Sequence, residues 1–130
     1  MQLALVTFLV RDYDEAIAFF CGQLGFALVE DTVLPEGKRW VRVAPEGAPG
    51  ATLLLAKAAT PEQDAAVGRQ TGGRVGFFLN TDDFDATYGL FLKNNVRFRE
   101  APRMEPYGKV AVFEDLYGNL WDLIEPAGDR

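Results

Sequence analysis

The tripeptide Asp12-Tyr13-Asp14 returns later in the chain as Asp83-Phe84-Asp85, and an apolar stretch precedes each copy. Before the first copy, residues 3–10 are rich in Val, Phe and Thr, which is typical of a strand buried on both faces. After it, apolar residues recur three and four positions apart, which predicts a helix with one apolar face. Because the second copy has the same surroundings, we predict a duplication of one structural unit.

Each copy of the predicted unit reads strand, helix and then three strands. Apolar patterning places the elements of the first copy at residues 3–10, 14–24, 26–33, 38–43 and 51–56. Those of the second copy are expected at residues 74–81, 83–94, 96–99, 109–114 and 119–125, with an irregular stretch at 100–108. Residues 57–73 are polar and broken by Pro61 and three glycines, which predicts a linker with one helical turn after Thr60-Pro61.

The predicted fold class is α+β, with one domain over residues 1–130. It consists of a first βαβββ module (1–57), a linker (58–73) and a second βαβββ module (74–130). A helix covers one face of each sheet and leaves the other face open. Two such modules placed edge to edge would form a curved, cup-like mixed sheet, and a concave sheet face is a natural small-molecule site.

Composition excludes several function classes. The chain has 130 residues and a formal net charge of −6, which argues against a nucleic-acid partner. It has no run of about 20 apolar residues, so we expect no membrane partner, and it lacks the pattern of a secretory signal, which predicts a cytoplasmic protein. There is no histidine and one cysteine, Cys21, which removes histidine-based triads, imidazole metal sites and thiolate clusters.

Three motifs in order carry a resemblance to a known family. They are Val6-Thr7-Phe8-Leu9-Val10-Arg11-Asp12 leading to Leu24-Gly25-Phe26, then Phe78-Leu79-Asn80-Thr81-Asp82-Asp83-Phe84-Asp85-Ala86, and finally Phe113-Glu114-Asp115-Leu116-Tyr117-Gly118-Asn119-Leu120-Trp121-Asp122-Leu123. In this arrangement the chain resembles the vicinal oxygen chelate superfamily, which includes glyoxalases, bleomycin-resistance proteins and extradiol dioxygenases. The resemblance covers nearly the whole chain and implies the cup-shaped fold.

The resemblance also implies where a metal site would lie. Metal-dependent members place one ligand on each of four strands, and those positions fall at Leu5, Leu54, Gly76 and Asp122 here. Only Asp122 has a donor side chain, whereas catalytic zinc sites use about three protein ligands. We therefore expect no metal and no cofactor.

The candidate ligand-binding residues are those expected to line the open sheet face. They are Leu5, Thr7, Trp40, Arg42, Leu54, Gly76, Phe78, Tyr107 and Asp122. Asp122 is the one candidate for catalysis, because a carboxylate in an apolar cup could act as a general base or anchor a cationic ligand. Its alternative role is a structural hydrogen bond to the backbone or to an arginine.

The other polar candidates also have two interpretations. Trp40 and Arg42 share a strand face and supply an aromatic plane and a planar cation, but they could equally be solvated residues of an edge strand. Tyr107 is expected to cluster with Arg103 and Lys109 in a lid over the later strands, or in a plain surface loop.

These features favour a metal-independent protein that binds a small molecule, such as an aromatic, cationic drug, and resembles bleomycin-resistance proteins that confer antibiotic resistance. The resemblance implies a homodimer. A second hypothesis is an enzyme in the same cup: a metal-dependent lyase or dioxygenase with other oxygen ligands, or a metal-free isomerase. A third is a domain with a filled cup that associates with another protein.

Overall fold

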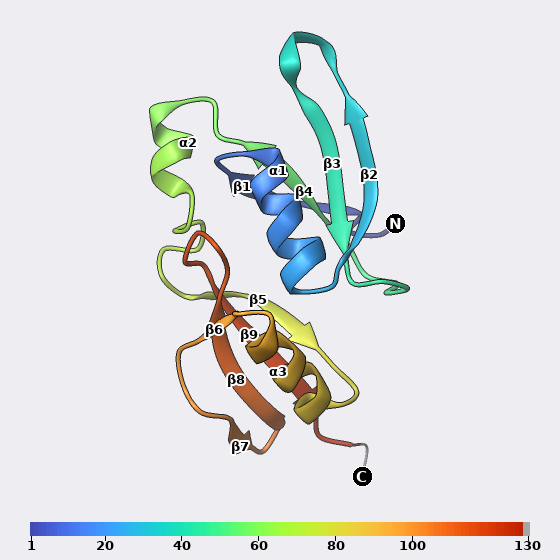
Figure 1. Ribbon diagram of the computed structural model, residues 1–130, viewed down its shortest axis with the longest axis vertical. Helices are drawn as coiled ribbons and strands as arrows, with labels where there is room; N and C mark the ends of the chain where they lie inside the picture. The colour runs from blue at the N-terminus through green and yellow to red at the C-terminus, as the bar shows by residue number, and fades with distance from the viewer. Residues whose placement is uncertain (129–130) are drawn as a thin grey trace. The chain divides into compact units, whose positions relative to one another are not determined.

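The computed structural model describes residues 1–128, so residues 129 and 130 of the predicted second module lie outside the described residues. The chain divides into two compact units, Met1–Gln70 and a second unit that begins at Thr71 (Figure 1). Each unit contains one sheet with helical segments packed against it.

The first unit has the predicted order of elements. These are β1 (Leu5–Val10), α1 (Tyr13–Ile17), the π-helix η1 (Ala18–Gln23), β2 (Ala27–Val33), the 3₁₀ turn η2 (Pro35–Gly37), β3 (Arg39–Ala44), β4 (Thr52–Lys57) and α2 (Pro61–Ala66). The sheet order is β1-β4-β3-β2, with β1 parallel to β4 and the other pairs antiparallel. The strand before the helix and the three strands after it thus form one four-stranded sheet, as the repeat predicts.

The second unit repeats this plan with one added strand. Its elements are β5 (Val75–Asn80), α3 (Phe84–Lys93), β6 (Arg97–Phe98), β7 (Arg103–Glu105), β8 (Gly108–Glu114) and β9 (Leu120–Pro126). The sheet order is β5-β9-β8-β6, and β7 also pairs with β8. Phe91 of α3 and Trp121 of β9 both contact the ring of Phe113, with centroids 5.5 and 5.7 Å apart. This aromatic cluster forms the core between α3 and the sheet.

The first strand differs from its prediction as a strand buried on both faces. It begins at Leu5, and Phe8 and Val10 are fully buried while Thr7, on the alternate face, is exposed. Phe8 packs edge-on against Phe20 of η1, with ring centroids 5.1 Å apart. The physical reason is that the helical segment covers one face of this sheet, so the run of apolar letters does not reflect equal burial of both faces.

The first helix also departs from a uniform α-helix over residues 14–24. Asp12 caps α1, since its carboxylate accepts a hydrogen bond from the Glu15 amide at 2.9 Å. The chain then widens into the π-helix η1, in which the Leu24 amide donates to the Phe19 carbonyl. Gly25 ends the segment at φ 77°, a left-handed conformation that favours glycine.

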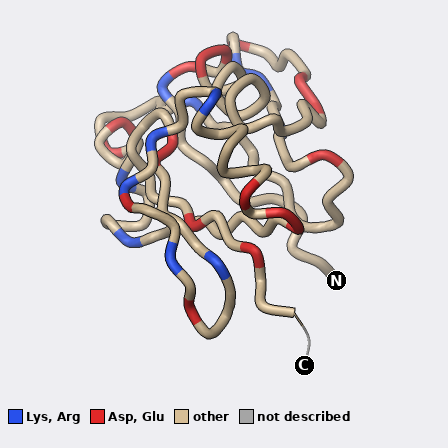
Figure 2. Tube along the Cα trace, turned by 60° about the horizontal axis from the view of Figure 1, so that its bottom comes forward, with Lys and Arg blue, Asp and Glu red and all other residues tan. Residues whose placement is uncertain are grey.

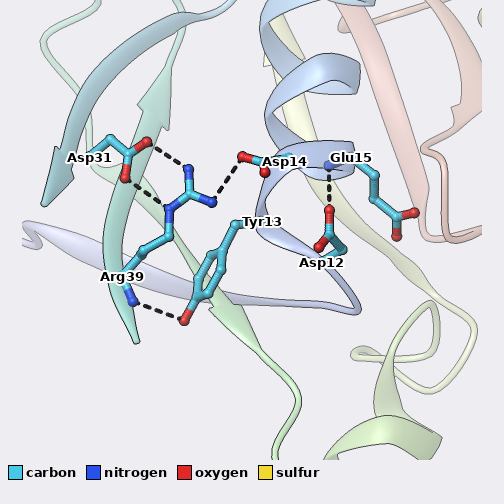
Figure 3. Close-up of polar contacts among 6 residues, drawn as sticks. All are labelled: Asp12, Tyr13, Asp14, Glu15, Asp31 and Arg39. Atoms are coloured by element: carbon cyan, nitrogen blue, oxygen red, sulfur yellow. Dashed lines mark hydrogen bonds and ion pairs between the residues drawn. The ribbon is translucent and has the colours of Figure 1, made fainter. Parts of the chain in front are cut away.

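A cation ties the start of α1 to the β2–β3 hairpin (Figure 3). Arg39 donates from Nε and one terminal nitrogen to Asp31, at 3.1 and 2.7 Å, and from the other terminal nitrogen to Asp14 at 2.9 Å. Its guanidinium also lies 5.2 Å from the ring centroid of Tyr13, whose hydroxyl accepts from the Arg39 amide. All three guanidinium nitrogens of Arg39 are therefore used inside the fold.

Residues 58–70 pack with the first unit. Thr60 caps α2 through the amide of Gln63 at 3.1 Å. The side chain of Gln70 lies along β1, where its oxygen accepts from the Leu9 amide at 2.9 Å and its nitrogen donates to the Thr7 carbonyl. Because β1 is an edge strand, this amide occupies backbone groups that a further strand would otherwise use.

The stretch 100–108, predicted as irregular, contains strand β7 between Pro102 and Pro106. Prolines lack an amide donor, but here they flank the strand rather than interrupt it. The register pairs Arg103 with Val110 and Met104 with Lys109, so Arg103 and Lys109 point to opposite faces of the sheet. Lys109 bonds Asp85 and lies over the Phe84 ring, so the predicted cluster of Arg103, Tyr107 and Lys109 was wrong with respect to Lys109.

Acidic and basic residues are spread in short segments along the trace, most of which is uncharged (Figure 2). Within the described residues, no helix has the length and apolar character needed to cross a membrane.

Candidate functional site

Strand alternation in β9 separates a core face from a helix-free face, by which we mean the face opposite α3. Trp121 and Leu123 are 3% and 0% exposed, and Trp121 stacks between Phe77 and Phe113 on the side of α3. Asp122 lies between them in sequence and therefore points to the helix-free face, as strand alternation predicts.

Asp122 is a buried carboxyl group with an unsatisfied oxygen. It is 8% exposed, and its Oδ1 atom has no hydrogen-bond partner within residues 1–128. Its neighbours in the sheet are Phe78 on β5 and Val112 on β8, neither of which has a side-chain donor. The predicted alternative, a structural hydrogen bond, is not made by this atom in the described part of the chain.

Burial raises the pKa of the Asp122 carboxyl, and the charge of Arg103 opposes this shift without cancelling it. The ionised form is therefore less stable here than in water. A group with this environment can gain from a cationic ligand or from a proton.

Arg103 lies on the same face of the second sheet, but its guanidinium is already engaged. It donates from Nε to Glu105 at 2.7 Å and from a terminal nitrogen to Glu100, whose carboxylate also accepts from the Val112 amide. The hydrogen bond to Glu105 is the main reason that the pKa of Arg103 is raised, and Tyr107 contributes. Sequence reasoning missed the two glutamates because the stretch was predicted as irregular. Glu105 lies two residues after Arg103 on the same strand, and Glu100 lies in the loop before it.

Three further candidates lie around Asp122 in sequence or register. Phe78 is 64% exposed and pairs directly with Asp122, which agrees with its expected position on the helix-free face. Tyr107 is 50% exposed in the turn between β7 and β8. Gly76 lies at a bulge between Val75 and Phe77, and a Cβ there would stand 2.4 Å from the methyl group of Thr71. Gly76 thus leaves room for Thr71 and has no side chain to line a site.

The remaining candidates belong to the first sheet, on its helix-free face opposite α1. The register aligns Thr7, Leu54 and Arg42 across three strands in one row. Leu5 lies two positions before Thr7, and Trp40 two positions before Arg42, so both share this face. Trp40 is 37% exposed. Val41 and Val43, which alternate with them, are fully buried on the opposite face.

Arg42 has a partner that sequence reasoning missed. Its Nε donates to one oxygen of Glu30 at 2.9 Å, and the other oxygen of Glu30 accepts from the Thr32 hydroxyl at 3.0 Å. The hydrogen bond from Arg42 is the main reason that the pKa of Glu30 is lowered. The detectable signal was alternation, since Glu30 and Thr32 share one face of β2 and pair with Arg42 and Trp40.

A second buried carboxylate close in sequence to Asp122 has a structural role. Asp115, in the β8–β9 turn, is 4% exposed and accepts hydrogen bonds from the amides of Tyr117 and Asn119, the side chain of Asn119 and the indole of Trp121. Burial raises the pKa of Asp115, while these four donors oppose the rise. Asp115 holds the turn together and has no capacity left for a ligand.

A family model described as the Glyoxalase/Bleomycin resistance protein/Dioxygenase superfamily matches residues 2–123. The chain belongs to this superfamily. The two βαβββ units are the arrangement that its members share, so the resemblance stated from the motifs is confirmed at the level of family and fold.

Three similar proteins illustrate this membership. An "Uncharacterized protein" of Shewanella frigidimarina (strain NCIMB 400) is 52% identical over 96% of this chain and 91% of its own length. The crystal structure of UcmS2 is 31% identical with a TM-score of 0.83 and covers 96% of this chain and 98% of its own. TnmS3, described as an antibiotic binding protein from Streptomyces sp. CB03234, is 30% identical with a TM-score of 0.78, covering 98% and 97%.

The resemblance to metal-dependent members of the superfamily implies a metal site at four positions of this chain. Of the four positions implied by the resemblance, Leu5, Leu54 and Gly76 carry no donor atom in their side chains, and only Asp122 has one. Within residues 1–128, no three His, Cys, Asp or Glu side chains gather where they could hold a metal ion. The residues present at these positions therefore do not fit a metal of the usual kind.

Proposed function

We propose that this protein binds a planar, positively charged small molecule at the helix-free face of the second sheet, without catalysis. The observation that carries the proposal is the buried Asp122 carboxyl group, whose Oδ1 lacks a partner within the described chain. A cation bound beside the carboxyl group would stabilise its ionised form, which burial otherwise disfavours.

The neighbour of Asp122 suggests what the rest of the ligand is. Phe78 presents an exposed aromatic ring on the same face. Such a ring stacks favourably on a planar apolar group, and contact with it removes apolar surface from water. The likeness to TnmS3, a protein described as antibiotic binding, supports a drug-like ligand and a role in antibiotic resistance. Homodimer formation and a cytoplasmic location stay predictions, the first of which light scattering would test.

A matched set of three ligands tests the proposal by calorimetric titration. 2-Naphthylmethylammonium, 2-naphthamide and 2-naphthoate share one ring system and are cationic, neutral and anionic at pH 7. Each would be titrated into the native protein and into Asp122→Asn, which keeps the shape of the side chain and removes its charge. Bleomycin would be included as a larger cationic drug.

We expect the cation to lose about tenfold in affinity in Asp122→Asn, since one charge-assisted contact contributes on the order of 1–2 kcal/mol, and the amide to be unaffected. Asp82→Asn is the matched control, because Asp82 is exposed and the substitution changes the net charge equally. Equal cation binding by native protein and Asp122→Asn would refute the proposal. Absence of binding to every cation at millimolar concentration would also refute it.

One observation favours a second function. A buried carboxyl with a raised pKa is suited to act as a general base, so an isomerase or lyase that removes a proton near Asp122 is the alternative. The test is turnover of a carbonyl substrate by the native protein. Loss of this turnover in Asp122→Asn, with turnover unchanged in Asp82→Asn, would favour the enzyme hypothesis over binding without catalysis.

A further inference from the structure

A second group of polar and aromatic side chains, Arg42 and Trp40, lies on the sheet of the first unit, whereas Asp122 belongs to the sheet of the second unit. Arg42 and Trp40 of β3 share the helix-free face of the first sheet with Leu54 of β4. Neighbouring residues of one strand face lie about 7 Å apart, which is within the length of a bicyclic aromatic ring. A planar ligand could therefore touch both side chains at once.

Within the described chain, the guanidinium of Arg42 is held by a hydrogen bond from its Nε atom only. Its Nε bonds Glu30, and Thr32 in turn bonds the second oxygen of Glu30. The lowered pKa of Glu30 means that this anchor stays ionised over a wide pH range. The two terminal nitrogens of Arg42, with four N–H donors between them, have no hydrogen-bond or ion-pair partner within residues 1–128.

Arg39, three residues earlier on the same strand, shows what a purely structural arginine looks like here. Its three nitrogens all donate to Asp31 and Asp14, and its plane covers Tyr13 (Figure 3). Arg42 has the same chemistry and a similarly limited exposure, 27% of its side chain against 23% for Arg39. It nevertheless leaves its two outermost donors unused. This difference indicates that Arg42 is held ready for an acceptor from outside the chain.

The surroundings of Arg42 narrow the class of acceptor. Trp40 is partly exposed and offers an aromatic plane, and the Thr52 hydroxyl on the same face is buried without a partner within the described residues. The two terminal nitrogens match the two oxygens of a planar carboxylate. A phosphate dianion would be repelled more strongly by the carboxylate of Glu30, so a monoanion is favoured.

We propose that the helix-free face of the first sheet binds a planar aromatic carboxylate, whose two oxygens accept from the terminal nitrogens of Arg42 while its ring packs against Trp40. Glu30 and Thr32 act as positioning residues that hold the guanidinium. This proposal names a second class of ligand and rests on residues of the first unit alone, not on Asp122.

The test compares 2-naphthoate with 2-naphthamide by calorimetric titration. In the native protein the carboxylate should bind about tenfold more tightly than the amide, because one anionic contact is lost in the amide. Arg42→Lys keeps the positive charge and removes the paired donors, so it should lose about tenfold for naphthoate and leave naphthamide binding unchanged. Arg69→Lys is the matched control, because Arg69 is exposed in the same unit.

A measurement on the native protein makes the test independent of any folding defect in the variants. In ¹H–¹⁵N spectra, naphthoate should shift the Nε resonance of Arg42 and the indole resonance of Trp40, and leave those of Arg39 and Trp121 in place. The proposal is wrong if naphthoate and naphthamide bind equally, if Arg42→Lys binds naphthoate like the native protein, or if the shifts appear at Arg39 instead. None of these results bears on Asp122, which is probed by the cationic ligand.

Discussion

Two buried carboxyl groups lie in the last hairpin of the chain, Asp115 in its turn and Asp122 on strand β9. They are buried to nearly the same extent, since Asp115 is 4% exposed and Asp122 is 8% exposed. Burial raises the pKa of both carboxyls. Yet Asp115 accepts hydrogen bonds from four donors, whereas the Oδ1 atom of Asp122 has no partner among the described residues.

The difference between these two carboxylates separates a group whose burial the fold compensates from one whose burial it does not, which is the basis of the binding role proposed for Asp122. Four donors, three from its own turn and the indole of Trp121, replace the water molecules that Asp115 loses on burial. The cost of burying Asp115 is therefore compensated within the fold. Asp122 has only the opposing charge of Arg103, a residue already bonded to Glu100 and Glu105. A buried polar group without compensation costs stability, and its presence is explained best by an interaction that a ligand completes.

The largest expected effect concerns Asp115. Replacement by alanine removes four acceptor contacts and leaves the buried indole N–H of Trp121 unsatisfied, so we expect a loss of about 2–4 kcal/mol in the free energy of unfolding. Chemical denaturation measures this loss. Asp82→Ala serves as the exposed control. A loss below that of the control variant would mean that Asp115 does not hold the turn.

The second effect has the opposite sign. Asp122→Asn removes a buried charge without ligand, so we expect the unliganded protein to gain about 1 kcal/mol in the free energy of unfolding at pH 7. The same variant loses affinity for the cationic ligand, so stability and binding change in opposite directions. Destabilisation of Asp122→Asn comparable to that of Asp115→Ala would show that both carboxylates are structural.

The smallest effect is a pH dependence. Because the folded-state pKa of Asp122 lies above its unfolded value, the folded protein keeps a proton that the unfolded chain has lost between those two values. The contribution of Asp122 to stability is therefore complete below the ordinary carboxyl pKa, near 3.9, and is lost as the pH rises through the raised folded value. The slope is less than about 1.4 kcal/mol per pH unit, the limit for one proton.

Denaturation curves across this pH range would isolate the contribution of Asp122 to the free energy of unfolding. They would be recorded for the native protein, Asp122→Asn and Asp82→Asn. We expect a flatter profile for Asp122→Asn and the native slope for Asp82→Asn. Asp115 contributes with the same sign in all three proteins, since burial raises its pKa as well. Identical slopes in native protein and Asp122→Asn would contradict the raised pKa of Asp122.

Much of the fold could be predicted because the signals are local. Apolar spacing and the repeated Asp-aromatic-Asp tripeptide indicate strand, helix and turn order in each unit, and the caps at Asp12 and Thr60 depend on residues three positions away. The errors are also local in origin. Strand β7 was missed because Pro102 and Pro106 suggested a break, and the π-helix η1 has the same apolar spacing as an α-helix.

For the candidate sites, the sequence predicts only which face of its strand each residue occupies. Alternation correctly separates Asp122 from Trp121 and Leu123, and Arg42 from Val41 and Val43. It could also have placed Glu30 on the face of Arg42, but it does not show that their side chains bond or that Glu100 and Glu105 engage Arg103. Glu30 and Arg42 lie on different strands, and their contact depends on register and on a bulge between Leu28 and Glu30. Glu100 lies in the loop before β7, whereas Glu105 lies two residues after Arg103 on β7 itself.

By itself the amino-acid sequence determined the duplicated βαβββ plan and the loss of donor side chains at Leu5, Leu54 and Gly76, since both are properties of residue type and order. Tertiary structure alone decided which charged groups are satisfied by the protein and which keep polar atoms without a partner among residues 1–128. The reason is that a hydrogen bond between distant residues forms only at a few ångströms and a suitable angle. Strand pairing sets that geometry, and it satisfies Arg39 and Asp115 while leaving Arg42 and Asp122 incomplete within the described chain.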